Sequence, residues 1–168
     1  MSWCETVKNN IPDYAKDIKL NLDAVINRSS LSVEEANGCA LACVTTIGNH
    51  YLVDIISADL DEAQKNAALS AGIIMAQNNI WYPYVDMTGD ANLKGLPAQL
   101  RMNVIGSHGG TTKELFEAYS LAASIIGKCH FCIQAHYESL KVMGYTVEKL
   151  RDIGRMASTI NALSKIKF

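Results

Sequence analysis

The chain has 168 residues, of which 49% are hydrophobic and 19% are charged, and its formal net charge is −2. This composition is typical of a globular protein with a sizeable core. There is no basic block for nucleic-acid binding, no run of the roughly 18 apolar residues that span a membrane, and no apolar secretion signal near the start. We therefore expect a cytoplasmic protein that contacts neither nucleic acid nor membrane.

Helical patterns follow one another along the chain. Residues 11–27 carry apolar side chains at three- and four-residue spacing, which predicts an amphipathic helix. Capping residues predict four further helix starts: Ser32 with Glu35, Asp59 with Glu62, Thr111 with Glu114, and Thr146. The Ala-rich helix that follows Asp59 is expected to end near residue 78.

Three segments carry weaker signals. Residues 51–56 and 102–106 are short apolar runs without a hairpin partner, so we interpret both as short helices. Residues 81–96 contain proline, glycine and aspartate, which predicts a loop whose aromatic residues serve packing, a subunit contact or substrate binding. The sequence thus predicts an all-α fold, a compact multi-helix single domain over residues 1–168 with about seven to nine helices.

The five cysteines suggest intracellular thiol chemistry. An odd number without an export signal argues against a structural disulfide framework. Cys129 and Cys132 form a C-x-x-C, which in a reducing compartment is typical of a redox pair or of metal ligands. Cys39 and Cys43 lie four apart on an apolar helix and are expected to be small buried side chains. Cys4 is expected in a mobile, reactive terminus.

The C-x-x-C is predicted to begin a helix. Helical periodicity breaks at Gly127 and then resumes, so both cysteines fall in the first turns, where the helix dipole favours a thiolate. At about 100° per residue, Cys132 lies about 60° from Cys129 around the axis, and His136 about 40° from Cys132. These three side chains share one face, whereas His130 is about 100° away from Cys129 and faces elsewhere.

Glu117 is the acid best placed to orient His136. If the chain folds back at Gly127 and Lys128, Glu117 lies about 15 Å and His136 about 12 Å from the turn, at nearly the same level. A carboxylate, a histidine and the thiols can then form a proton relay. Glu114, by contrast, is interpreted as a capping residue.

A structural zinc site is the main alternative from a different class. Such a site needs four ligands, but Cys129, Cys132 and His136 supply three on one face, and there is no second C-x-x-C. The thiols could also be buried without a chemical role. The presence of Glu117 favours redox chemistry over both alternatives.

The pattern of Glu117, Cys129-x-x-Cys132 and His136 is similar to that of the alkylhydroperoxidase D family. The segments IPDYAKDIKLNL, AQNNIWY and LRMNVI also resemble that family's longer members. The resemblance implies an all-helical homotrimer that reduces hydroperoxides. Well-known members carry a further histidine immediately before the second cysteine, where this chain has Phe131. His130 stands one place earlier, so it is only a possible site residue.

The resemblance also implies roles for the matching residues. Cys132 would react with the peroxide and become a sulfenic acid, and Cys129 would donate a proton and close the Cys129–Cys132 disulfide. Glu117 and His136 would form the activating relay. No metal or bound cofactor is implied. Electrons would come from external dihydrolipoamide on a lipoyl-bearing acyltransferase and pass to a two-cysteine peroxiredoxin, through a mixed disulfide at Cys132.

Two further readings stay open at this point. The first is an adaptor that mainly reduces a peroxiredoxin and has little peroxidase activity of its own. The second is a decarboxylase-like relative on the same scaffold, against which the cysteine pair argues, because such relatives can lack it. Fold alone does not decide between these functions.

Overall fold

The fold is described by a computed structural model that covers residues 2–168. In this range there are ten α-helices and no strand, which confirms the predicted all-α class but exceeds the predicted seven to nine helices. The helices are α1 (Trp3–Asn10), α2 (Lys16–Asn27), α3 (Val33–Ile47), α4 (His50–Ser57), α5 (Glu62–Thr88), α6 (Ala91–Lys94), α7 (Asn103–Ser107), α8 (Lys113–Gly127), α9 (His130–Val142) and α10 (Val147–Leu163). Two short 3-10 helices, η1 (Asp13–Ala15) and η2 (His108–Gly110), complete the set.

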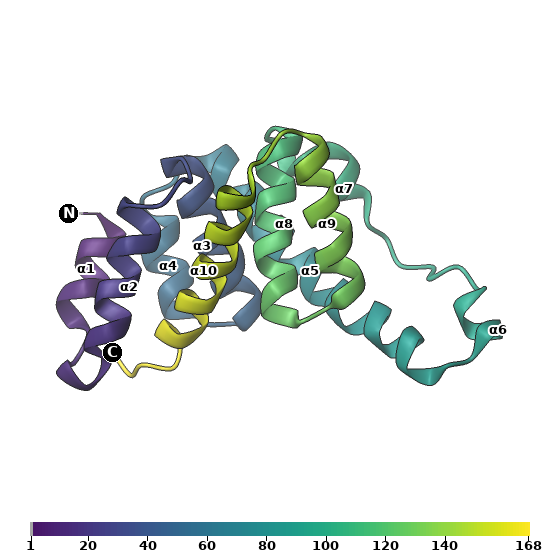
Figure 1. The fold of residues 1–168 in the computed structure, drawn as a ribbon, viewed down its shortest axis with the longest axis horizontal. Helices are drawn as coiled ribbons and strands as arrows, with labels where there is room; N and C mark the ends of the chain where they lie inside the picture. The colour runs from purple at the N-terminus through teal and green to yellow at the C-terminus, as the bar shows by residue number, and fades with distance from the viewer. Residues whose placement is uncertain (1) are drawn as a thin grey trace.

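The helices form a bundle centred on α3. This helix packs against α5, α8 and α10, while α9 packs on α8 and α5. Figure 1 shows α1 and α2 at one end of the molecule, with both chain termini nearby. At the other end, residues 81–100 project from the bundle and are called the arm below. Helix α9 carries Cys132 and His136 and begins directly after Cys129. These residues therefore lie where α9 contacts the bundle from one side.

Small residues let the central helices approach one another closely. A side chain added at Gly38 on α3 would meet the Tyr119 ring on α8 at 2.1 Å. One added at Gly72 on α5 would meet the main-chain oxygen of Ala42 at 2.8 Å. The fully buried Tyr119 fills the space that Gly38 leaves. This tight α3–α8–α5 contact fixes the helices from which most of the site is built.

The predicted helix starts are confirmed in part. Ser32 and Thr146 are the N-caps of α3 and α10, and Ser32 forms a capping box with Glu35. The other two starts were placed too early. Asp61 caps α5 in place of Asp59, and Thr112 caps α8 in place of Thr111. In both stretches a second capping residue stands one or two positions later, and it is the one that caps the helix.

The predicted loop at residues 81–96 is wrong in its first half. Helix α5 continues through Pro83 to Thr88, and α6 adds one more turn. An interior proline removes one helical hydrogen bond and its ring crowds the carbonyl one turn earlier, so it usually kinks or ends a helix, but here α5 continues past it. Because the arm is exposed, its side chains need no amphipathic spacing, so the sequence lacks the usual helical signal. The interpretation of residues 51–56 and 102–106 as helical is confirmed by α4 and α7.

The expected mobile terminus around Cys4 is also wrong. Cys4 lies on α1 and is 1% exposed, among the core residues of the bundle. Burial raises the pKa of its thiol to about 11, so it is not a reactive thiolate at neutral pH. Cys39 and Cys43 are fully buried as predicted, and burial raises the pKa of both thiols.

Candidate active site

A tight turn between α8 and α9 positions the cysteines. Helix α8 ends at Gly127, Lys128 adopts a left-handed conformation with φ of 53°, and Cys129 is the N-cap of α9. Gly127 is required here because an added Cβ would lie 2.0 Å from the Asn79 amide nitrogen on α5. The predicted reversal at Gly127 and Lys128 is therefore confirmed.

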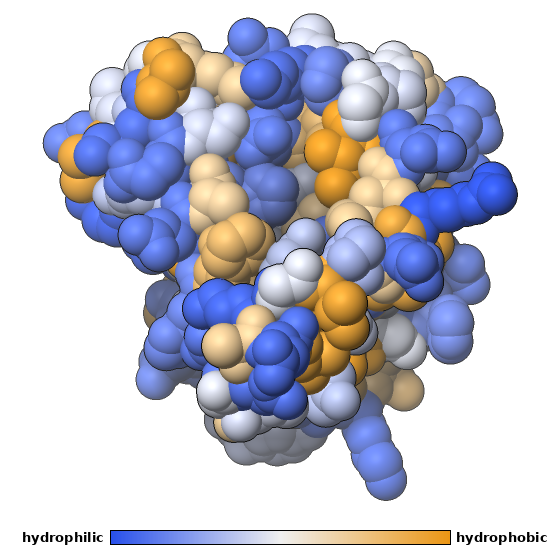
Figure 2. All heavy atoms as spheres, turned by 90° about the vertical axis from the view of Figure 1, so that its right-hand side faces the viewer, coloured by the Kyte–Doolittle hydropathy of each residue, from blue (hydrophilic) through white to orange (hydrophobic). Residues whose placement is uncertain are grey.

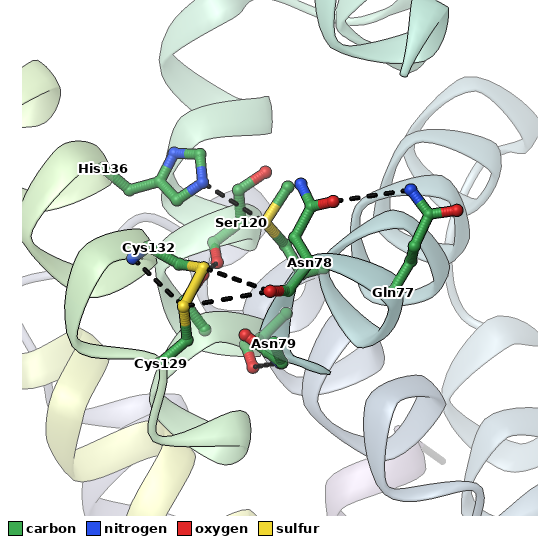
Figure 3. Close-up of a disulfide and its surroundings, with 10 residues drawn as sticks. Gln77, Asn78, Asn79, Ser120, Cys129, Cys132 and His136 are labelled. Atoms are coloured by element: carbon green, nitrogen blue, oxygen red, sulfur yellow. Dashed lines mark hydrogen bonds between the residues drawn. A yellow bond between two sulfur atoms is a disulfide. The ribbon is translucent and has the colours of Figure 1, made fainter. Parts of the chain in front are cut away.

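Cys129 and Cys132 form a disulfide whose Cα atoms are 5.2 Å apart. Cys129 is fully buried and Cys132 is 3% exposed. The Cys132 main-chain N–H donates to Cys129 Sγ at 3.2 Å, so the positive end of α9 points at the first sulfur. The main-chain oxygen of Asn78 lies 3.8 Å from Cys132 Sγ and 4.0 Å from Cys129 Sγ (Figure 3).

Glu117 and His136 meet as the sequence predicted. Glu117 Oε2 lies 2.7 Å from His136 Nδ1, and the side chains are 11% and 13% exposed. The pair joins α8 to α9 across the turn, at the level expected from the helical rise. Figure 3 shows the His136 ring beside the disulfide. In a site so shielded from water, a carboxylate–histidine pair can hold and move a proton effectively.

The other nitrogen of His136 faces a residue that sequence reasoning missed. His136 Nε2 lies 3.2 Å from Met75 Sδ, and Met75, on α5, is 1% exposed. The two partners of the ring are thus Glu117 and Met75, and neither ring nitrogen forms a hydrogen bond with Cys129 or Cys132. Nothing in the sequence distinguishes Met75 from an ordinary core methionine.

His130 and Phe131 lie away from this cluster. His130 is exposed on the first turn of α9, on a different side from His136, as its helical angle predicts. Phe131 is 60% exposed and stacks on Tyr82 of the arm with ring centroids 4.5 Å apart. The structure therefore brings Glu117, His136 and both cysteines together, and leaves His130 outside.

Within residues 2–168, two buried oxygens near the disulfide have no hydrogen-bond partner. They are the side-chain oxygens of Ser120 on α8 and Asn79 on α5. Both residues lie beside the disulfide in Figure 3. Buried polar groups are usually paired, so these two oxygens, both closed to solvent, are exceptions next to the disulfide.

An apolar groove borders the same turn. It has a volume of about 590 Å³ and lies between the arm and the end of α8. Its lining residues are Asn79, Ile80, Pro83, Tyr84, Met87, Thr88, Gly127 and Lys128. Figure 2 views the molecule from the arm end, where apolar patches alternate with hydrophilic side chains around a hollow. The groove brings apolar surface close to Cys129.

Across residues 2–168, no three histidine, cysteine, aspartate or glutamate side chains converge in a way that could hold a metal ion. In the same range, no helix combines the length and apolar character needed to cross a membrane.

The comparison with known proteins first gives a broad class. The profile of the carboxymuconolactone decarboxylase family matches residues 92–167, a stretch that contains Glu117, both cysteines and His136. Relatives that match nearly the whole chain then point to one family within this class. The chain is 40% identical to the alkyl hydroperoxide reductase AhpD of Coxiella burnetii (strain RSA 493 / Nine Mile phase I), over 96% of this chain and 95% of that protein.

Two further relatives carry the same name. The alkyl hydroperoxide reductase AhpD of Rhodospirillum centenum is 40% identical over 96% of this chain and 89% of its own length. That of Hyphomonas neptunium is 37% identical over 96% of this chain and 92% of its own length. The chain therefore belongs to the alkyl hydroperoxide reductase AhpD family, as its motif resemblance implied.

Proposed function

We propose that this protein is an antioxidant peroxidase that reduces alkyl hydroperoxides and hydrogen peroxide through a Cys129/Cys132 dithiol–disulfide cycle. The observation that carries the proposal is the Glu117–His136 pair beside the Cys129–Cys132 disulfide. Its relatives, named alkyl hydroperoxide reductases, support the choice of peroxide as substrate.

In the oxidative half of the cycle, His136 takes the proton of Cys132, with Glu117 holding the ring. The Cys132 thiolate attacks one peroxide oxygen, the O–O bond breaks, and Cys129 gives its proton to the departing oxygen to form alcohol or water. The Cys129 thiolate then attacks the Cys132 sulfenic acid. The disulfide forms, and the released hydroxide takes a proton from solvent. Cys132 suits the first attack because it is the more exposed of the two residues, at 3% against 0%.

In the reductive half, an external dithiol restores both thiols. One thiolate of the dithiol attacks Cys132, and Cys129 leaves as a thiolate that accepts a hydrogen bond from the Cys132 N–H at the start of α9. The second thiolate of the dithiol then attacks the dithiol's own sulfur in the mixed disulfide, Cys132 leaves, and both cysteine thiolates take up a proton. We propose dihydrolipoamide on a lipoyl-bearing acyltransferase as the dithiol, with no cofactor bound to the protein. A two-cysteine peroxiredoxin would accept electrons through a mixed disulfide at Cys132. This cycle suits the cytoplasm, where thiols are kept reduced.

Steady-state turnover tests the proposal. With dihydrolipoamide as reductant, wild-type protein is expected to consume hydroperoxide, and Cys132→Ser and Cys129→Ser are each expected to lose turnover. Cys43→Ala, which removes a fully buried thiol outside the site, is the matched control. Undiminished turnover in either serine variant would refute the dithiol cycle.

The adaptor role is distinguished by adding a two-cysteine peroxiredoxin to the same assay. The direct peroxidase is expected to consume hydroperoxide at a substantial rate without it. If consumption is slow with the lipoyl system alone and rises greatly when the peroxiredoxin is present, the adaptor role is correct.

We further propose that the arm forms the contact between subunits of a homotrimer. Its apolar side chains project from the bundle and are exposed, namely Tyr84, Met87, Leu96 and Leu100. Exposed apolar surface of this kind commonly marks a protein interface. Light scattering after size exclusion is expected to give a trimer mass for the wild type and a smaller mass for Met87→Glu. A monomeric wild type would contradict this assembly.

A further inference from the structure

We propose that Met75 is a positioning residue for His136, and that the Met75 thioether accepts a hydrogen bond from the His136 Nε2–H while the Cys129–Cys132 pair is oxidised. The inference deepens the proposed function, because it concerns the proton that the dithiol cycle moves. It rests on one contact, His136 Nε2 to Met75 Sδ at 3.2 Å, between a methionine that is 1% exposed and a histidine side chain that is 13% exposed.

The geometry gives each nitrogen of the His136 ring its own acceptor. Nδ1 faces a carboxylate oxygen of Glu117 at 2.7 Å, and Nε2 faces the thioether sulfur of Met75. A thioether has no hydrogen to donate, so it can only be the acceptor in a hydrogen bond with His136. The hydrogen of that bond must therefore be on Nε2. The arrangement therefore suits a ring with a hydrogen on both nitrogens, oriented by α8 on one side and α5 on the other.

A weak acceptor serves this position better than a strong one. Sulfur in a thioether accepts hydrogen bonds only weakly, so it can orient the Nε2–H without holding the proton tightly. An oxygen acceptor in the same dry site would form a stronger bond and compete with the cysteine for the proton. Met75 thus keeps the ring in place and leaves its proton transferable.

The proton then alternates between two positions during the cycle. When the second thiolate of an external dithiol attacks the mixed disulfide at the dithiol's own sulfur, Cys132 leaves as a thiolate. It takes the proton from His136 Nε2, and the neutral ring keeps its Nδ1–H on Glu117. Before the next peroxide arrives, Cys132 returns the proton to Nε2. The hydrogen bond from Nε2–H to Met75 then forms again. Each transfer moves one proton and no electron.

Two pairs of proteins test this assignment. The first pair is Met75→Leu and Met156→Leu, because Met156 is also fully buried but lies on α10, outside the site. The second pair is wild-type protein with all six methionines replaced either by selenomethionine, which keeps the acceptor, or by norleucine, which keeps only the shape. Circular dichroism and thermal midpoints establish that each protein is folded.

Two readouts are measured on the oxidised proteins at one fixed pH near neutrality. In ¹⁵N NMR, the His136 Nε2 signal is expected to be that of a protonated nitrogen in the wild type, Met156→Leu and selenomethionine proteins. It is expected to move toward the unprotonated value in Met75→Leu and norleucine proteins. Reduction of the disulfide by dithiothreitol is expected to slow roughly twofold to tenfold in the same two proteins, the effect of losing one hydrogen bond.

The proposal is overturned if Met75→Leu and norleucine proteins keep both the wild-type Nε2 signal and the wild-type reduction rate. It is also overturned if Met156→Leu or selenomethionine protein changes as much as Met75→Leu. Neither readout uses peroxide. A wild-type protein without peroxide turnover would therefore count against the proposed function, while an Nε2 signal insensitive to Met75 would count against this assignment alone.

Discussion

The His136 ring is fixed at both of its nitrogens, and this fixation is the central feature of the site at the scale of single residues. Glu117 holds Nδ1 and Met75 holds Nε2, so the ring cannot turn without losing a contact. The disulfide lies beside it, with Cys129 at the start of α9. A base held in one orientation can act on the same thiol in every cycle.

Glu117→Gln and His136→Gln are expected to slow peroxide turnover about tenfold to a hundredfold, because the proton of Cys132 then lacks an oriented acceptor. The loss is expected to be larger at lower pH, since hydroxide can replace the missing base only as pH rises. The pH dependence of turnover measures this. Glu114→Gln removes an exposed carboxylate from the same helix and serves as the control. Full activity in Glu117→Gln at all pH values would exclude the relay.

Helical spacing was sufficient to predict the contact between Glu117 and His136. Glu117, Cys132 and His136 lie on two helices joined by a tight turn, so the rise and angle per residue determine their levels and faces. Met75 could not be predicted in the same way. It reaches His136 from α5, 61 residues away in the chain, and the register between α5 and α9 depends on packing that no local spacing encodes.

At the scale of elements, the turn between α8 and α9 determines where the cysteines lie. Gly127 lets the end of α8 touch Asn79 on α5, and Lys128 reverses the chain. The sequence predicted this turn because glycine interrupts a clear helical pattern. It did not predict the helical arm, because Pro83 and exposed side chains weaken the pattern that identifies a buried helix.

Gly127→Ala is expected to destabilise the protein by roughly 1–3 kcal/mol, because the added methyl group overlaps the Asn79 side chain and forces α5 and α8 apart. Urea unfolding measures the change in the free energy of unfolding. The rate of disulfide reduction is expected to change as well. Gly154→Ala in α10 is the matched control. Its new methyl group meets nothing within 4 Å, so helix propensity predicts a gain of about 0.5–1 kcal/mol. Equal effects in the two variants would contradict the packing argument.

At the scale of the whole molecule, a buried carboxylate joins distant parts of the chain. Asp152 on α10 is 1% exposed and accepts hydrogen bonds from the Ser30 N–H, the Ser30 hydroxyl and Arg155, each at 2.8 Å. It thereby ties the link between α2 and α3 to the last helix. Burial alone would raise the pKa of Asp152, but these hydrogen bonds outweigh it and hold the pKa well below its usual range.

This lowered pKa predicts an acid-sensitive part of the stability. A carboxyl group whose pKa is lower in the folded state stabilises the protein above its unfolded pKa of about 3.9, and this contribution is lost as pH falls below that value. Asp152→Asn is expected to cost about 1–3 kcal/mol near pH 7, and its stability is expected to fall less than that of the wild type as the pH is lowered from about 5 to about 2.

Urea unfolding of both proteins at several pH values measures this difference. Asp54→Asn, in which an exposed carboxylate is lost, controls for the change of one charge. If Asp152→Asn loses as much stability as the wild type over the acid range, Asp152 is not a source of the acid sensitivity.

Trapping the sulfenic acid tests the central claim, the Cys129/Cys132 cycle, most directly. Reduced Cys129→Ser protein, which cannot close the disulfide, is treated with one equivalent of hydroperoxide in the presence of dimedone, and the adduct is located by peptide mass mapping. The cycle proposed here predicts an adduct on Cys132 and none on Cys4, Cys39 or Cys43. An unmodified Cys132, or a dimedone adduct found only on another cysteine, would contradict it.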